Sequence, residues 1–345
     1  MSKITIKDIA RESGFSIATV SYVINGVPNK AKESTKRKIE AVIAKYNYSP
    51  DMNARSMVNV SSNLLGILYY SPKSEVNFSD PFLSDLLTGI EVKVKGSNKF
   101  ILVHGFSEID DIKAIQNNWK FDGFVVIGAV SSIHDQIDRF LQGPVVFIDT
   151  YFNRAKETAK AKYPRIYVNN HDSNLAYLAT QRLLAAGHTK IAFFSPHIGL
   201  NENGVVYHRI KGIKKALAEE DLAFDDEIFF DETEVQQLVD QHSEYTAVLA
   251  NSDLLAMTAI KELKIRNILG KSIISFDNSF FATGLEPALT TVELNQKEKG
   301  EAAIQALIDA EHVKQVPTKR IITISGKLIE RDSVKGANND GKTWM

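Results

Sequence analysis

Apolar and polar positions alternate with helical spacing at the start of the chain. Thr5 precedes an apolar series and is followed three residues later by Asp8, a capping arrangement that predicts a helix over 6–12. Ser16 offers the N-cap of a second helix, which runs to a helix-stop signal at 25–26. Two short helices around a glycine-containing turn have the spacing of a helix-turn-helix, in which the second helix lies in the DNA major groove.

The second helix has two faces of different character. Val20, Val23 and Ile24 share one face and are expected to pack against the first helix and against a third helix predicted over 34–45. The opposite face is half apolar and almost uncharged, and it consists of Ile17, Ala18, Ser21 and Tyr22.

From residue 64 onward, short apolar runs alternate with helical patterns of crossover length, which predicts parallel, doubly wound sheets. The runs form two series, so we expect two α/β lobes that hold a ligand between their strand ends. The first series is 64–70, 99–105, 123–129 and 144–150, and the second is 166–170, 190–195, 247–252 and 272–278.

The composition excludes several chemistries. The 345 residues include no cysteine, which removes disulfides, thiolate zinc sites, iron–sulfur clusters and a cysteine nucleophile. No long apolar run and no charged leader is present, so the sequence predicts a soluble cytoplasmic protein. No cofactor or metal is expected.

The net charge of -1 hides an asymmetry along the chain. Residues 1–62 hold ten lysines and arginines against five acidic residues, a net charge of +5, so the remainder carries -6. A basic head on an acidic body points to a polyanionic partner for the head, although a solvated basic surface has the same composition.

Residues 5–57 resemble the DNA-binding head of the lactose-repressor (LacI/GalR) family of bacterial transcription regulators. The resemblance rests on the cap Thr5, "DIA", the glycine of the turn, "ATVS", "NG", "NYSP" and "ARSM". It implies base contacts from Ile17, Ala18 and Tyr22. It also implies phosphate contacts from Thr5, Thr19, Ser21 and Asn25.

Tyr22 departs from the family pattern, which most often has arginine at this position. The bidentate arginine contact to guanine is therefore absent, and Ile17 and Ala18 would instead pack on thymine methyl groups. Packing of Tyr22 on the head's own surface is the alternative.

The segment 49–62 is predicted to be a hinge, with one or two helical turns too short to stand alone in water. In the family this segment folds on the operator and inserts a leucine wedge into the minor groove. Met57 occupies the wedge position, and methionine is apolar and flexible enough for that role. Ala54 and Arg55 would lie beside it in the groove.

The resemblance extends over the body to about Ser333 and implies a periplasmic-binding-protein architecture. The expected fold class is α/β: an all-α head, then a two-lobed body with two parallel doubly wound sheets. A helix over 298–310 and one strand over 320–333 should close the body. The expected units are a head at 1–48, the hinge at 49–62, a body at 63–333 and a loose tail at 334–345. Within the body, the first lobe comprises about 63–164 and 294–321, and the second about 165–293 and 322–333.

The family match also assigns an effector pocket. Arg209 would bind a sugar hydroxyl or carboxylate with its guanidinium fork, and Asp277 would accept hydrogen bonds from ligand hydroxyls. Because a strand-end aspartate often caps the following helix, Asp253 has that alternative role, and the aromatic residues could instead belong to the core. The full predicted set is Tyr70, Phe82, Asp149, Arg209, Ser252, Asp253 and Asp277.

The sequence therefore predicts a ligand-responsive DNA-binding transcription regulator, a repressor of carbohydrate-utilisation genes. Its expected partners are a pseudo-palindromic operator, a sugar or sugar phosphate and a second copy of the chain, since the tail has no leucine heptad for tetramers. A solute-binding protein without a regulatory role is the alternative. An enzyme is not expected, because the "LGKS" at 269–272 lacks the first glycine of a P-loop.

Overall fold

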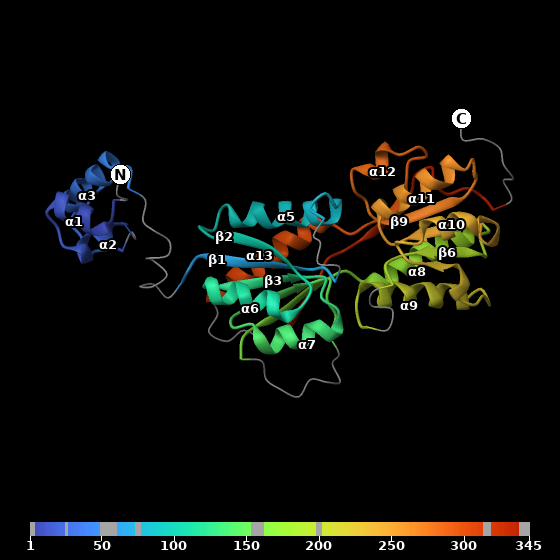
Figure 1. The fold of residues 1–345 in the computed structure, drawn as a ribbon, viewed down its shortest axis with the longest axis horizontal. Helices are drawn as coiled ribbons and strands as arrows, with labels where there is room; N and C mark the ends of the chain where they lie inside the picture. Colours follow the sequence, from blue (N-terminus) through green and yellow to red (C-terminus); the bar gives the residue numbers. More distant parts are fainter. Residues whose placement is uncertain are drawn as a thin grey trace. The chain divides into compact units, whose positions relative to one another are not determined.

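The computed structural model describes residues 4–24, 27–48, 61–72, 77–152, 162–197, 202–312 and 319–337 (Figure 1). Its contacts divide the chain between Ser62 and Asn63 into two units, a head and a body. Within these described residues, no helix is long and apolar enough to cross a membrane. The predicted DNA contacts Asn25, Ala54, Arg55 and Met57 lie outside the described residues, as does most of the tail.

The head contains the three expected helices around a small core. Ile9, Val20 and Ile39 are fully buried there, which confirms the predicted inner faces. Thr5 donates its backbone N–H to Asp8 Oδ2 at 3.0 Å, which fixes the start of the first helix, and Gly14 ends it with a φ of 75° that favours glycine. The helices are α1 (Ile6–Ser13), α2 (Ile17–Ile24) and α3 (Glu33–Lys45).

The first lobe of the body is a six-stranded parallel sheet with the order β11-β5-β4-β3-β1-β2. Its strands are β1 (Leu64–Tyr70), β2 (Phe100–Phe106), β3 (Gly123–Ile127), β4 (Val145–Ile148), β5 (Arg165–Asn169) and β11 (Lys319–Thr323). Its helices are α5 (Pro81–Val94), α6 (Ile109–Asn118), α7 (Ser131–Phe140) and α13 (Gln296–His312).

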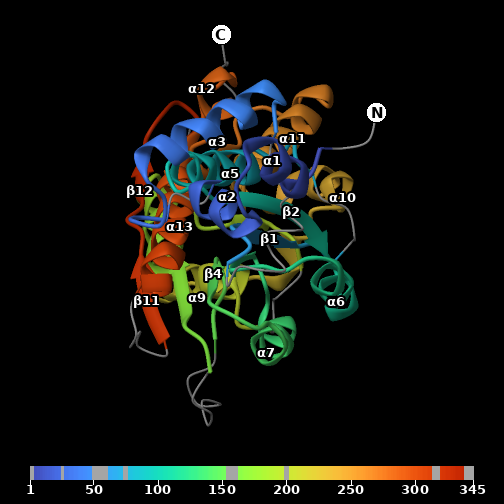
Figure 2. The same ribbon diagram turned by 90° about the vertical axis from the view of Figure 1, so that its left-hand side faces the viewer.

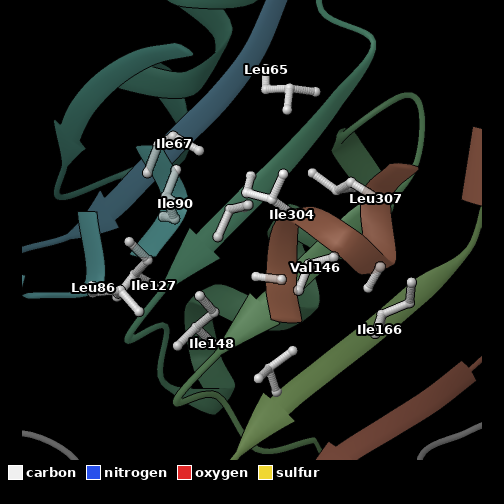
Figure 3. Packing of buried hydrophobic residues seen from close by; sticks show 14 of the residues in the cluster. Leu65, Ile67, Leu86, Ile90, Ile127, Val146, Ile148, Ile166, Ile304 and Leu307 are labelled. Atoms are coloured by element: carbon white, nitrogen blue, oxygen red, sulfur yellow. The ribbon is translucent and has the colours of Figure 1, made fainter. Parts of the chain in front are cut away.

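Successive residues of each strand in this sheet enter two different cores. Ile67 of β1 and Val146 of β4 pack under α5 and α13, as Figure 3 shows, whereas Leu68 and Phe147 pack under α6 and α7. Figure 2 shows the two helix pairs on opposite sides of the strands. The strands therefore need to be apolar on both faces, which explains the continuous apolar runs of the sequence.

The second lobe repeats this plan with the strand order β12-β10-β9-β8-β6-β7. One face is covered by α8 and α9 and the other by α10, α11 and α12 (Figure 1). The strands are β6 (Ile191–Phe194), β7 (Phe229–Phe230), β8 (Ala247–Ala250), β9 (Ser272–Asp277), β10 (Thr290–Glu293) and β12 (Lys327–Ile329). The helices are α8 (Asp172–Ala185), α9 (Val205–Ala218), α10 (Val235–Asp240), α11 (Asp253–Ile265) and α12 (Phe281–Gly284).

Two details of the expected lobes are corrected by the strand pairing. The strand expected at 166–170 was assigned to the second lobe, but it is β5, which lies between β4 and β11 in the first sheet, because the chain crosses only after Asn169. The single strand expected over 320–333 is two strands, since β11 belongs to the first sheet and β12 pairs antiparallel with β10 in the second.

The chain crosses between the lobes three times, after β5, after β10 and after β11. Asn170 joins the three crossings, because its Nδ2 donates to the carbonyl of Leu294 at 3.1 Å and to that of Ile324 at 2.9 Å. The side chain is buried, and its Oδ1 has no partner in the described part of the chain. One amide group thus ties together three segments that are distant in sequence.

Candidate nucleic-acid interface and ligand cleft

The outer face of α2 is the candidate nucleic-acid interface. Ile17 is 46% exposed and Tyr22 39%, and Ala18 between them is also exposed, while Val20 on the opposite side is fully buried. These neighbouring side chains give α2 an exposed apolar face, and contiguous exposed apolar surface favours a contact site.

Three of the predicted phosphate contacts lie in described parts of the head: Thr19 and Ser21 on α2, and Thr5 at the N-cap of α1. Ser16 caps α2 by accepting the backbone N–H of Thr19 at 3.1 Å, and the two hydroxyl oxygens lie 2.9 Å apart. The Thr5 hydroxyl lies at the start of α1 and donates to Asp8 at 2.7 Å. Ser21 is partly exposed on α2.

A cleft of about 320 Å³ lies between the lobes of the body. The first lobe contributes the end of β1, the start of α5 and the loops after β3 and β4, and the second lobe contributes α9, α11 and the end of β9. The carboxyl ends of parallel strands in both lobes therefore meet at the cleft, which is where open α/β sheets bind ligands.

Six predicted pocket residues line this cleft, and one does not. The six are Tyr70, Phe82, Asp149, Arg209, Ser252 and Asp277. Asp253 is instead buried beneath it, where it accepts hydrogen bonds from the hydroxyls of Ser275 and Thr291 and from the backbone N–H of Ser279. Its suggested helix-capping role is also wrong, because Ser252 is the N-cap of α11 and accepts the N–H of Leu255 at 3.2 Å.

Arg209 is held in place from three sides. Its Nε donates to Asp172 Oδ1 at 3.1 Å, and its Nη1 donates to the carbonyl and side-chain oxygens of Asn251 at 2.6 and 2.8 Å. The guanidinium also lies 3.9 Å from the ring centre of Phe276. Among the described residues Nη2 has no hydrogen-bond partner, so a rigidly positioned donor remains for a ligand.

The two aspartates that line the cleft at strand ends differ in their surroundings. Asp149, after β4, accepts hydrogen bonds from the buried Lys299 Nζ at 2.8 and 3.0 Å. The carboxyl group of Asp277, at the end of β9, has no hydrogen-bond partner within the described chain, and burial, reinforced by the Asp253 carboxylate, raises its pKa well above the usual range. Asp277 is therefore the carboxyl group with capacity to bind a ligand hydroxyl or cation.

Sequence reasoning missed four polar groups of the cleft. They are Tyr69, Asp80, Glu232 and Asn251. The Asp80-Pro81 pair carried a signal, because an aspartate before proline is typical of a helix start, and Asp80 does cap α5 by accepting the N–H of Phe82 at 3.0 Å. Glu232 carried none, since an acidic residue in a loop normally lies on the solvated surface.

Contacts at the rim connect the lobes. Glu202 of the second lobe accepts the backbone N–H of Ser132 at 2.8 Å, at the N-terminus of α7 in the first lobe. Thr150 and Gly204 form a β-bridge across the same boundary. A change in the angle between the lobes has to break or rebuild these contacts.

A helix-turn-helix head followed by a two-lobed body with a cleft at its strand ends defines a DNA-binding transcription regulator with a ligand site. Residues 5–51 match the family described as bacterial regulatory proteins, lacI family, and residues 180–334 match the periplasmic binding protein-like domain. The chain therefore combines a lacI-family DNA-binding domain with a periplasmic-binding-protein-like domain.

Relatives of known function match over nearly the whole chain. The HTH-type transcriptional repressor PurR of Vibrio atlanticus is 28% identical over 97% of this chain and 99% of its own length. The HTH-type transcriptional regulator MalR of Clostridium butyricum is 28% identical over 95% and 98%, and the ribose operon repressor of Haemophilus influenzae is 27% identical over 88% and 91%. All three relatives are named as transcriptional regulators or repressors.

Solved structures share the fold. The lac repressor dimer bound to operator and the anti-inducer ONPF has a TM-score of 0.78 at 18% identity, covering 97% of this chain and 100% of the other. The complex of the transcriptional regulator CelR with cellobiose has a TM-score of 0.67 at 20% identity, covering 96% and 100%.

Proposed function

We propose that the chain is a homodimeric repressor of carbohydrate-utilisation genes whose operator affinity is set by a sugar in the cleft. The observation that carries the proposal is the cleft itself, which joins the Nη2 donor of Arg209 and the carboxyl of Asp277 to the aromatic rings of Tyr70 and Phe82. A guanidinium N–H and a carboxyl group bind sugar hydroxyls, and aromatic rings stack on the apolar faces of sugar rings. Relatives named for ribose and cellobiose support this effector class.

On the DNA side, Ile17, Ala18 and Tyr22 are assigned to the bases and Thr5, Thr19, Ser21 and Asn25 to phosphates. The exposed apolar face of α2 supports contacts to thymine methyl groups in the major groove. Ala54, Arg55 and Met57 are assigned to the minor groove from the sequence resemblance alone. Operator binding requires chromosomal DNA, so the protein would act at the bacterial nucleoid.

The two activities are linked in the proposed mechanism. Both lobes contribute to the cleft, so a ligand changes the angle between them and the contacts of Glu202 and Thr150 at the rim. In a dimer with two heads on one operator, this movement changes the spacing of the hinge segments. Ligand and operator then alter each other's affinity by a coupling energy of typically about 1–3 kcal/mol.

A pair of matched variants of the full-length chain tests the proposal. Ala18→Asp adds a negative charge to the exposed face of α2, and Ala41→Asp adds the same charge to an exposed position of α3. Ala18→Asp should abolish binding to a palindrome selected from random DNA, while Ala41→Asp should weaken it only slightly. Thermal stabilisation by the effector should survive in both variants, since the cleft is untouched.

The same experiments distinguish a transcription regulator from a solute-binding protein without a regulatory role. A wild-type chain that selects no DNA sequence at physiological salt, yet is stabilised by a sugar, would be a solute-binding protein. Equal loss of DNA binding in the two variants would contradict the assignment of α2 as the reading helix.

A further inference from the structure

Carboxylates of the two lobes face one another across the cleft. Asp80 belongs to the first lobe, and Glu232 and Asp277 belong to the second. Burial raises the pKa of Asp80, and the charge of Glu232 adds to the rise. Asp80 in turn contributes to the raised pKa of Asp277, after burial and Asp253. Each carboxyl group therefore disfavours the ionised form of the one on the opposite lobe.

Two cations near the cleft each have a carboxylate partner other than Asp80 and Asp277, although Nη2 of Arg209 remains available to a ligand hydroxyl. Arg209 pairs with the buried Asp172, and Lys299 pairs with Asp149. Neither Asp80 nor Asp277 takes part in an ion pair anywhere in the described ranges. Both side chains are partly exposed at the cleft surface, so a positive group that enters the cleft can reach the two carboxylates that no cation of the described residues neutralises.

The aromatic wall beside these carboxylates suits the same kind of group. Tyr69, Tyr70 and Phe82 line the cleft on the first lobe. Burial, together with the charges of Asp80, Glu232 and Asp149, raises the pKa of Tyr69 to about 12, so its ring stays neutral and its hydroxyl keeps its proton. Aromatic faces attract cations and also stack on sugar rings.

We propose that the effector is a polyhydroxylated molecule that carries a protonated amine and no phosphate or carboxylate, with the amine held between Asp80 and Asp277. The inference rests on the proposed function of the cleft, and it specifies the chemical class of the ligand that binds there. An ammonium group between carboxylates of opposite lobes attracts both and draws the lobes together. A phosphate in the same place would add two negative charges to a site that already repels them.

Ligands that differ only in one charged group test the preference for a positive charge on the full-length wild-type protein. Each series compares a parent sugar with its 2-amino, N-acetylated and 6-phosphorylated forms, starting with glucose, glucosamine, N-acetylglucosamine and glucose 6-phosphate. The same comparison is repeated with galactose and mannose. Adenosine and 3′-amino-3′-deoxyadenosine are added to distinguish an amino sugar from an aminated nucleoside. Titration calorimetry should give at least tenfold tighter binding for an amine than for its uncharged counterparts, and no binding of the phosphate.

Variants locate the amine. Asp80→Asn keeps an oxygen to cap α5 and to accept from hydroxyls, but it removes the charge. The preference for the amine over the parent should fall at least fivefold in Asp80→Asn and in Asp277→Asn. Asp85→Asn, which removes a carboxylate from the same helix outside the cleft lining, should leave the preference unchanged.

The proposal is wrong if no aminated ligand binds more tightly than its parent sugar or nucleoside, or if a phosphorylated form binds tightly. It is also wrong if the preference for the amine persists in both Asp80→Asn and Asp277→Asn. If a sugar without an amine releases the operator, the amine proposal is wrong, but the proposed regulatory function is supported. Tight binding of an amine without any effect on operator affinity would support the charge inference and contradict the regulatory function.

Discussion

Replacing Asn170 with alanine tests the hydrogen bonds that tie the three crossings together. The substitution leaves the buried carbonyls of Leu294 and Ile324 without this donor. An unsatisfied buried acceptor costs about 1–3 kcal/mol, so the two should lower the free energy of unfolding of the body by about 2–6 kcal/mol. Asn118→Ala is the control, because it removes a bond of similar length to a backbone carbonyl, 2.8 Å, at an exposed position, and should cost under about 0.5 kcal/mol.

Urea unfolding of the full-length variants, followed by tryptophan fluorescence and circular dichroism, measures the difference. Asn170→Asp sharpens the test, because an oxygen in place of Nδ2 would face both carbonyls and should destabilise the body more than alanine does. If Asp is tolerated better than Ala, the amide points the other way and the tie between the crossings does not exist. Equal stability of Asn170→Ala and Asn118→Ala would contradict the reasoning as well.

Three further predictions follow from single side chains. Arg209→Ala should remove the ligand response and, by leaving Asp172 buried without its cation, destabilise the body by about 3–5 kcal/mol; operator release at the wild-type ligand concentration would contradict the pocket assignment. Tyr22→Arg should shift the preferred half-site toward guanine, with a discrimination of about 1–3 kcal/mol, and an unchanged preference in a random-site selection would refute base contact at this position. Burial lowers the pKa of His188 below its ordinary value of 6.5, so the unfolded chain takes up a proton that the folded body excludes. The free energy of unfolding should therefore fall as the pH drops below 6.5 and stay level above it, and His188→Asn should reduce this slope in urea titrations.

The sequence was sufficient for elements whose pattern is local. The capping pair Thr5 and Asp8 set the start of α1, and strands covered by helices on both faces produced continuous apolar runs. The sheet that each strand joins is not a local property. Residues 165–169 read as a strand in either lobe, and their place is decided by pairing with β4 and β11 and by the crossing at Asn170.

The same distinction applies to the cleft. Arg209 and Asp277 follow recognisable landmarks, and both line it. Asp253 also belongs to a recognisable landmark, yet its carboxylate accepts hydrogen bonds from Ser275 and Thr291. These partners are 22 and 38 residues away, and no short sequence pattern indicates them. Asp80 was missed because its role in the cleft depends on facing a second lobe that folds from other parts of the chain.

The triple crossing also has a consequence for synthesis on the ribosome. The first sheet needs β11, which begins at residue 319, about 150 residues after β5 ends. At about 5–20 residues per second, β5 waits roughly 8–30 s for this neighbour, and the face that α13 covers stays open for most of that time. Neither lobe can therefore mature as an independent co-translational unit, and a stop codon ahead of residue 319 would remove an edge strand from both lobes at once.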